Sequence, residues 1–166
     1  MAANPLTDFR FHGVSLAVAA VAGVATYGTT AVMLPASAMF LGWVAFNLAG
    51  TATRDNLANI ASFLIGLALG IGTAISILLL TPTLGAAATP LAVSGVVILV
   101  LSLRTMAPLN NPIAYFLGLT SFFYSSLAPT VTTYAILASA AVIGAASCAA
   151  ATLLQTFVQP QTALEA

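Results

Sequence analysis

The sequence predicts an all-α integral membrane protein with six transmembrane helices, arranged as two inverted three-helix repeats in which the middle helix is short. The chain of 166 residues is 61% hydrophobic and only 4% charged, whereas a soluble domain carries about 25% charged residues. Long stretches contain no acidic, basic or histidine residue, and one motif recurs later in the chain. So few charges cannot cover a water-facing surface, which excludes a soluble globular domain, a nucleic-acid-binding protein and a disordered tail.

The uncharged stretches are 13–53, 56–103 and 105–164. Each has room for two helices, because one span needs roughly 20 apolar residues. The expected helices are 13–33, 35–50, 57–80, 91–103, 112–126 and 130–158. They are separated by Pro35, a polar turn at 51–56, a Thr-, Pro- and Gly-rich loop at 81–90, Asn110–Pro112 and Pro129. We expect 13–33 to be a retained span, because it is longer than the apolar region of a signal peptide, about 7–15 residues.

The recurring motif is the short aromatic segment Ala38–Phe46, which matches Ala114–Phe122 at five of nine positions. The same offset of 76 residues carries 13–33 onto 89–109 and 57–80 onto 133–156. Each half is therefore a long helix, a short aromatic helix and a long helix. We expect a single membrane domain over 1–166, with repeat one at about 13–80 and repeat two at about 89–156.

Charge placement predicts the topology. If all six segments cross the membrane, every charged residue falls on one side: Asp8, Arg10, Arg54, Asp55, Arg104 and Glu165. If the two short segments were instead re-entrant, Arg54 and Arg104 would face away from Arg10. The positive-inside rule favours six crossings with both termini in the cytoplasm. Three crossings per half make the repeats inverted, as in many secondary transporters, whose sites lie near the midplane.

The residue types argue against catalysis. His12 is the single histidine, and no Cys, His and carboxylate cluster has the spacing of a metal site. We therefore expect no enzyme activity, no metal and no cofactor. The absence of acidic and basic residues from the spans disfavours a proton-driven pump or a cation channel with an acidic ring. A pathway of hydroxyls, amides and aromatic rings suits a small uncharged solute.

The repeated motif supplies the candidate pore- or substrate-lining residues. These are Phe40, Trp43, Phe46, Asn47, Phe116, Thr120 and Phe122. The first three are spaced three apart and share a broad helix face, and two such faces would form a narrow aromatic slot. The alternative is that the rings pack inside the bundle or belong to the interfacial aromatic belt. Asn47 needs a partner inside lipid, so it faces a pathway or joins two helices.

Two polar sequences are expected to shape helix ends. Asn110 and Asn111 are better explained as a turn or helix cap than as a filter. Thr130, Thr132 and Thr133 are better explained as a cap of the last helix than as a polar vestibule.

Pro35, the segment Phe40–Phe46 and the following polar turn and Gly-rich span resemble a family of small bacterial inner-membrane proteins of unknown function, the group that includes YcdZ. Ala114–Gly118 fits the later part of that pattern, and the similarity covers roughly 15–155. The resemblance implies a bacterial inner-membrane location and no established reaction. A second likeness, to urea and ammonium-type channels, is architectural only, because those proteins have longer repeats.

We therefore expect a passive channel or facilitator for a small uncharged solute such as a urea-like amide, ammonia or water. The alternative is a structural or accessory membrane protein whose Gly- and Ala-rich helices serve oligomeric assembly without transport. The expected partners are the lipid bilayer, the neutral solute and further copies of the chain, with no nucleic acid. An Ala-rich face of the last helix favours a homo-oligomer, with a trimer as the expected stoichiometry: Ala138, Ala141, Ala145 and Ala149.

Overall fold

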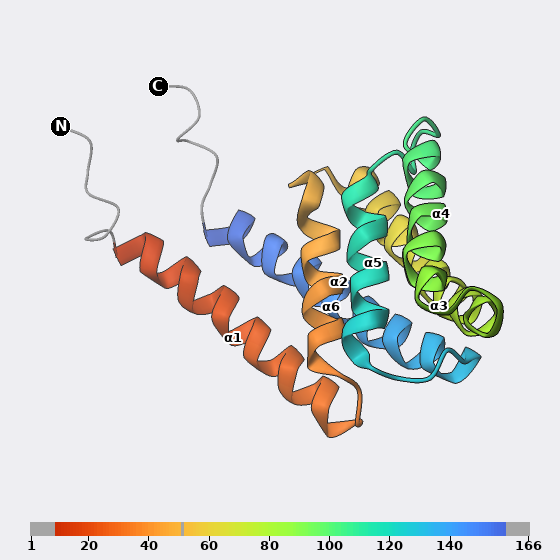
Figure 1. Ribbon diagram of the computed structural model, residues 1–166. Helices are drawn as coiled ribbons and strands as arrows, with labels where there is room; N and C mark the ends of the chain where they lie inside the picture. The colour runs from red at the N-terminus through yellow and green to blue at the C-terminus, as the bar shows by residue number, and fades with distance from the viewer. Residues whose placement is uncertain (1–8, 51, 159–166) are drawn as a thin grey trace.

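The computed structural model describes residues 9–50 and 52–158, and within these the side chains of 12–50 and 52–157. This part of the chain is all-helical, as predicted. Its helices are α1 (Phe9–Ala31), α2 (Ala36–Phe46), α3 (Thr53–Leu84), α4 (Ala88–Leu103), α5 (Pro112–Ser125) and α6 (Val131–Val158), with 3₁₀ turns η2 (Asn47–Ala49) and η3 (Gly85–Ala87). Consecutive α-helices run in opposite directions (Figure 1).

Three segments are long and apolar enough to cross a membrane: His12–Ala31, Thr53–Leu103 and Val131–Phe157. The middle segment has 51 residues with a mean hydropathy of 2.5, and it contains α3 and α4 joined at η3. A bilayer core needs only about 20 helical residues, so this segment is long enough for two spans. Many large apolar side chains on these helices are exposed, which is expected where lipid rather than water surrounds them. The chain is therefore a membrane protein.

The two middle helices are short, with 11 residues in α2 and 14 in α5. α5 begins at Pro112, where the missing backbone N–H is not needed by the helix. Asn111 caps this helix, because its Oδ1 accepts a hydrogen bond from the backbone N–H of Ile113 at 3.1 Å. At the start of α6, Thr130 Oγ1 accepts from the N–H of Thr133 at 3.1 Å. Both predicted caps are confirmed.

The predicted loop at 81–90 is wrong. α3 continues through Pro82 and is ended by Gly85, whose φ of +52° suits a helix C-terminus. Inside an apolar segment, backbone polar groups must be satisfied within the helix. The threonines on either side of Pro82 help, because their hydroxyls bond to carbonyls of the preceding turn at 2.6 and 3.0 Å. Pro90 is the third residue of α4, in the first turn, where proline is tolerated.

α2 and α6 run in the same direction and pack through glycine (Figure 1). Gly42 faces the backbone of Ala141, and Gly144 faces the backbone of Met39, so closely that a Cβ at either glycine would overlap its neighbour. Glycine at such positions lets two helix backbones approach. We call this contact the α2–α6 seam.

α3 and α5 pack in the same way, also side by side and in the same direction (Figure 1). Gly66 faces the backbone of Tyr115, and Gly118 faces the backbone of Phe63, again with no room for a Cβ. One turn further along α3, a Cβ on Gly70 would lie 3.2 Å from the Cβ of Phe122. We call this contact the α3–α5 seam.

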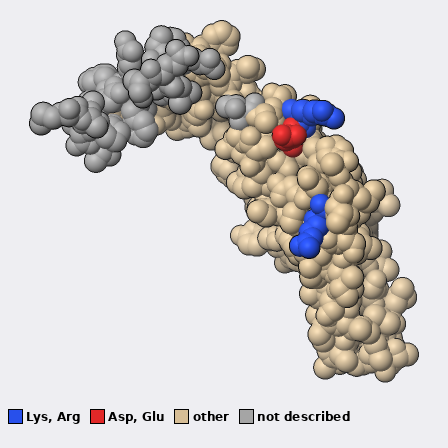
Figure 2. All heavy atoms as spheres, turned by 90° about the horizontal axis from the view of Figure 1, so that it is seen from above, with Lys and Arg blue, Asp and Glu red and all other residues tan. Residues whose placement is uncertain are grey.

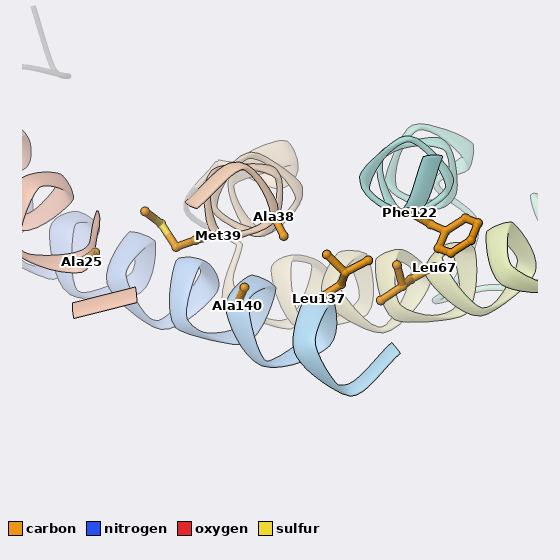
Figure 3. Packing of buried hydrophobic residues seen from close by; sticks show 7 residues of the cluster. All are labelled: Ala25, Ala38, Met39, Leu67, Phe122, Leu137 and Ala140. Carbon is orange, nitrogen blue, oxygen red and sulfur yellow. The ribbon is translucent and has the colours of Figure 1, made fainter. Parts of the chain in front are cut away.

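A buried apolar cluster joins the two seams (Figure 3). Its members are Ala25, Ala38, Met39, Leu67, Phe122, Leu137 and Ala140. They come from α1, α2, α3, α5 and α6, and Figure 3 shows Leu137 of α6 beside Leu67 of α3. The centre of the subunit is therefore packed with aliphatic and aromatic side chains.

The charged side chains that the structure describes lie on one face of the molecule, at the end where α3 begins and α4 ends (Figure 2). They are Arg54, Asp55 and Arg104. Asp8, Arg10 and Glu165, which the sequence predicts on the same side, lie outside the residues whose side chains are described. For the three described residues, the predicted clustering of charge is observed.

Candidate functional site

A polar pocket lies at the charged end, between the start of α3 and the segment that leads into α5. Its lining residues are Ala49, Asp55, Asn59, Pro108, Asn110, Asn111 and Pro112. Its volume of about 350 Å³ is near the lower end for small-molecule pockets. One carboxylate and three side-chain amides therefore meet in a space suited to a small ligand.

A chain of hydrogen bonds fixes the orientation of two of these amides. The backbone N–H of Ile113 donates to Asn111 Oδ1 at 3.1 Å, so the other end of that amide must be its NH₂ group. Asn111 Nδ2 in turn donates to Asn59 Oδ1 at 2.9 Å. Asn59 Nδ2 is left without a hydrogen-bond partner, although Asn59 is only 4% exposed.

An unpaired buried amide is costly, by about 1–3 kcal/mol, and its neighbour Asn56 shows how the fold avoids that cost. Asn56 Oδ1 accepts from the N–H of Ala49 at 3.1 Å, and Asn56 Nδ2 donates to the carbonyl of Gly50 at 2.7 Å. Asn56 therefore closes the turn between α2 and α3 and has a structural role. Asn59, one helical turn deeper, keeps an N–H available for a ligand.

Small and polar residues continue from the pocket along one face of α3. Ser62, Gly66, Gly70 and Thr73 follow Asn59 at spacings of three and four, which places them in one row. Ser62 is fully buried and its hydroxyl also has no partner, whereas Thr73 Oγ1 donates to the carbonyl of Leu69 at 2.7 Å. Two successive polar side chains below the pocket thus have unused hydrogen-bonding capacity.

The α3–α5 seam closes the space beneath these groups. Gly66 and Gly118 bring the two helix backbones into contact about one turn below Ser62. In this conformation the polar row therefore leads into a closed helix contact, and a molecule passing this level requires α3 and α5 to separate.

The sequence-predicted lining residues do not share one cavity. Trp43 and Phe46 lie together in a cluster with Ala145 and Cys148 of α6. Phe116 packs against Val100, Tyr115 and Leu119, whereas Phe122 belongs to the central cluster. Phe40, Asn47 and Thr120 are exposed on the subunit. The structure thus brings two of the seven into contact, and within one subunit Phe46 and Phe122 have packing positions. Whether the set forms a slot stays a prediction.

The sequence analysis did not single out Asp55, Asn59 or Ser62 as site residues. A signal was available, because Asn59 and Ser62 are polar residues inside an expected span and have the spacing of a helix face. The aromatic motif drew attention to α2 and α5 instead. The pairing of Asn59 with Asn111, 52 residues away, is not visible in a single sequence.

Comparison with known proteins gives one positive finding. The model of the family described as "Protein of unknown function (DUF1097)" matches residues 15–152. Curated proteins and solved structures give no significant match. The family match confirms the resemblance to a family of unknown function.

Proposed function

The chain belongs to the DUF1097 family of proteins of unknown function, and from its geometry we propose that it is a passive facilitator for a small uncharged solute, which enters at the polar pocket. The observation that carries this proposal is the buried Asn59 amide, unpartnered at the inner wall of a pocket on the charged end. A small neutral solute needs only a few such groups to replace its lost hydration. No charged side chain lies within the buried core of the described residues, which agrees with a neutral substrate.

The two seams support the inverted-repeat part of the proposal. Met39 and Tyr115, and likewise Gly42 and Gly118, are related by an offset of 76, and they contact α6 and α3 respectively. Their partners, Gly144 and Gly66, are related by an offset of 78. The short helix of each half therefore packs on the long last helix of the other half. Under this equivalence, the offset of 76 expected for the long helices changes by two residues.

The same equivalence supports a functional role for the polar groups. At an offset of 78, Asn59 and Ser62 correspond to Leu137 and Ala140, which are both fully buried. The second half thus builds an equivalent seam from apolar side chains alone. Because the packing does not require an amide and a hydroxyl there, we attribute them to solute handling.

The closed seam determines what kind of facilitator is proposed. Backbone contact between Gly66 and Gly118 leaves no opening at that level. Solute passage would therefore accompany a movement of α5 relative to α3, so we propose a facilitator that opens and closes rather than a permanently open pore.

Orientation and assembly complete the proposal. Arg54 and Arg104 at the pocket end place that end in the cytoplasm by the positive-inside rule, which agrees with six crossings and both termini at the cytoplasmic side of a bacterial inner membrane. We also propose a homo-oligomer, for which a trimer was expected. The Ala-rich face of α6 is a poor candidate for its interface, because Ala141 and Ala145 are buried within the subunit.

A structural or accessory role is the second candidate. It is favoured by the closed α3–α5 seam and by a groove of about 640 Å³ between α1 and α6, lined largely by alanine and valine. Small residues of this kind permit close helix contact in membranes. Under this alternative the polar pocket would bind without any transport.

Flux through reconstituted vesicles tests the proposal. Proteoliposomes are mixed with gradients of urea, ammonia or an impermeant osmolyte, and the vesicle volume or internal pH is followed by stopped flow. We expect at least one solute to cross faster than in empty liposomes. The double variant Asn59→Leu, Ser62→Ala, which installs the residues of the other seam, should lower that rate to the level of empty liposomes.

The matched control is Gln155→Leu, which removes an exposed amide from α6, outside the pocket. It should leave the flux unchanged. Size-exclusion profiles and Trp43 fluorescence check that both proteins fold. Rates equal to those of empty liposomes for every solute would reject the facilitator and favour the accessory role.

A further inference from the structure

We propose that the polar pocket selects a solute that carries a carbonyl acceptor and an N–H donor on the same small molecule, that is, a primary amide or urea-type compound. This inference rests on the proposed function, because it takes the pocket to be the solute entrance. It goes further in excluding the other small solutes as preferred ligands.

The acceptor requirement follows from the orientation of Asn59. Rotating its amide by 180° would place Asn59 Nδ2 against Asn111 Nδ2, two donors in contact, because Asn111 is itself fixed by the N–H of Ile113. The unused group of Asn59 is therefore an N–H donor, and a complementary ligand must offer an acceptor. A simple cation has none.

The donor requirement comes from Asp55, one helical turn before Asn59 on α3 and on the same pocket wall. Its carboxylate is an acceptor only when ionised, and it repels an anion. A ligand that binds between Asp55 and Asn59 therefore presents an N–H group to one residue and an oxygen to the other. A primary amide has this pattern within a single planar group, and acetone or formate lacks the donor.

The depth of the site agrees with a small ligand. Asn59 Nδ2 is covered in this conformation, so a ligand reaches it only after a movement of the pocket rim, to which Asn110 is exposed. Beyond it, the Ser62 hydroxyl is unpartnered about one turn deeper. A ligand that replaced the contact with Asn59 by one with Ser62 would move toward the α3–α5 seam.

Asparagine side-chain NMR tests this inference without any flux measurement. The chain has six asparagines, so ¹⁵N-asparagine labelling in nanodiscs gives few signals, and Asn59→Leu assigns the one of interest. Acetamide, acetone and formate are titrated separately. We expect a saturable shift of the Asn59 signal with acetamide and binding weaker by about tenfold or more for acetone, which lacks the N–H group. Asp55→Ala should weaken acetamide binding to the acetone level without weakening acetone binding.

The outcomes separate the two proposals. Equal affinity for acetamide and acetone, or a stronger response to formate, would overturn the selectivity. No saturable shift with any probe would mean that only water occupies the pocket, and would also overturn it, even if vesicle flux is observed. Saturable acetamide binding without flux would support the site while rejecting the facilitator.

Discussion

The α3–α5 seam makes a sharp prediction for Gly66→Ala. Alanine is favoured over glycine in a helix by about 1 kcal/mol, but its Cβ would overlap the backbone of Tyr115, which cannot rotate away as a side chain would. Overpacking in a close-packed core costs about 1–3 kcal/mol, and more when backbone must shift. We therefore expect the free energy of unfolding to fall by about 2 kcal/mol.

Gly72→Ala on the same helix is the matched control. Gly72 is exposed, and a Cβ there meets nothing within 4 Å, so the substitution should raise stability by up to about 1 kcal/mol. Titration of native micelles with a denaturing detergent, followed by the fluorescence of the single tryptophan, measures both variants. If Gly66→Ala proves as stable as Gly72→Ala, the seam geometry is incorrect.

Three further predictions use related measurements. Ser62→Ala removes a buried hydroxyl that has no partner and should stabilise the protein by about 1 kcal/mol; Ser76→Ala, which removes an exposed hydroxyl, should be nearly neutral, and equal effects would argue that Ser62 has a partner. Asn111→Ala removes the cap of α5 and leaves the Asn59 oxygen unpaired, so the same titration should show a loss of about 2 kcal/mol; an unchanged midpoint would contradict the hydrogen-bond chain. Cysteines at Met33 and Met106, both exposed beyond helix ends, should react with an impermeant maleimide from opposite sides of sealed vesicles in a background lacking the native cysteine, and labelling from one side only would refute the alternating topology.

Helix ends were predicted well wherever a local signal decides them. Asn111 and Thr130 have short side chains that can satisfy the first N–H groups of a following helix, and this requires no knowledge of the rest of the chain. The segment 81–90 failed because its prolines were taken as breakers. Pro90 falls in a first turn, and Gly85 is the residue that ends α3.

The candidate site was predicted less well. An aromatic motif that recurs in the sequence attracts attention, but side chains such as Phe46 and Phe122 are buried as packing residues. The unused donors of Asn59 and Ser62 are defined by what does not contact them. Such an absence depends on every neighbouring element, and no local pattern reports it.

Composition alone determined that this chain resides in a membrane, since the transfer of so many apolar residues from water dominates any local preference, and proline, glycine and capping residues set most helix ends. The tertiary structure decided which helices meet. α2 selects α6 and α3 selects α5 because glycines distant in sequence permit backbone contact there, and only that packing leaves one amide of the resulting polar pocket without a partner.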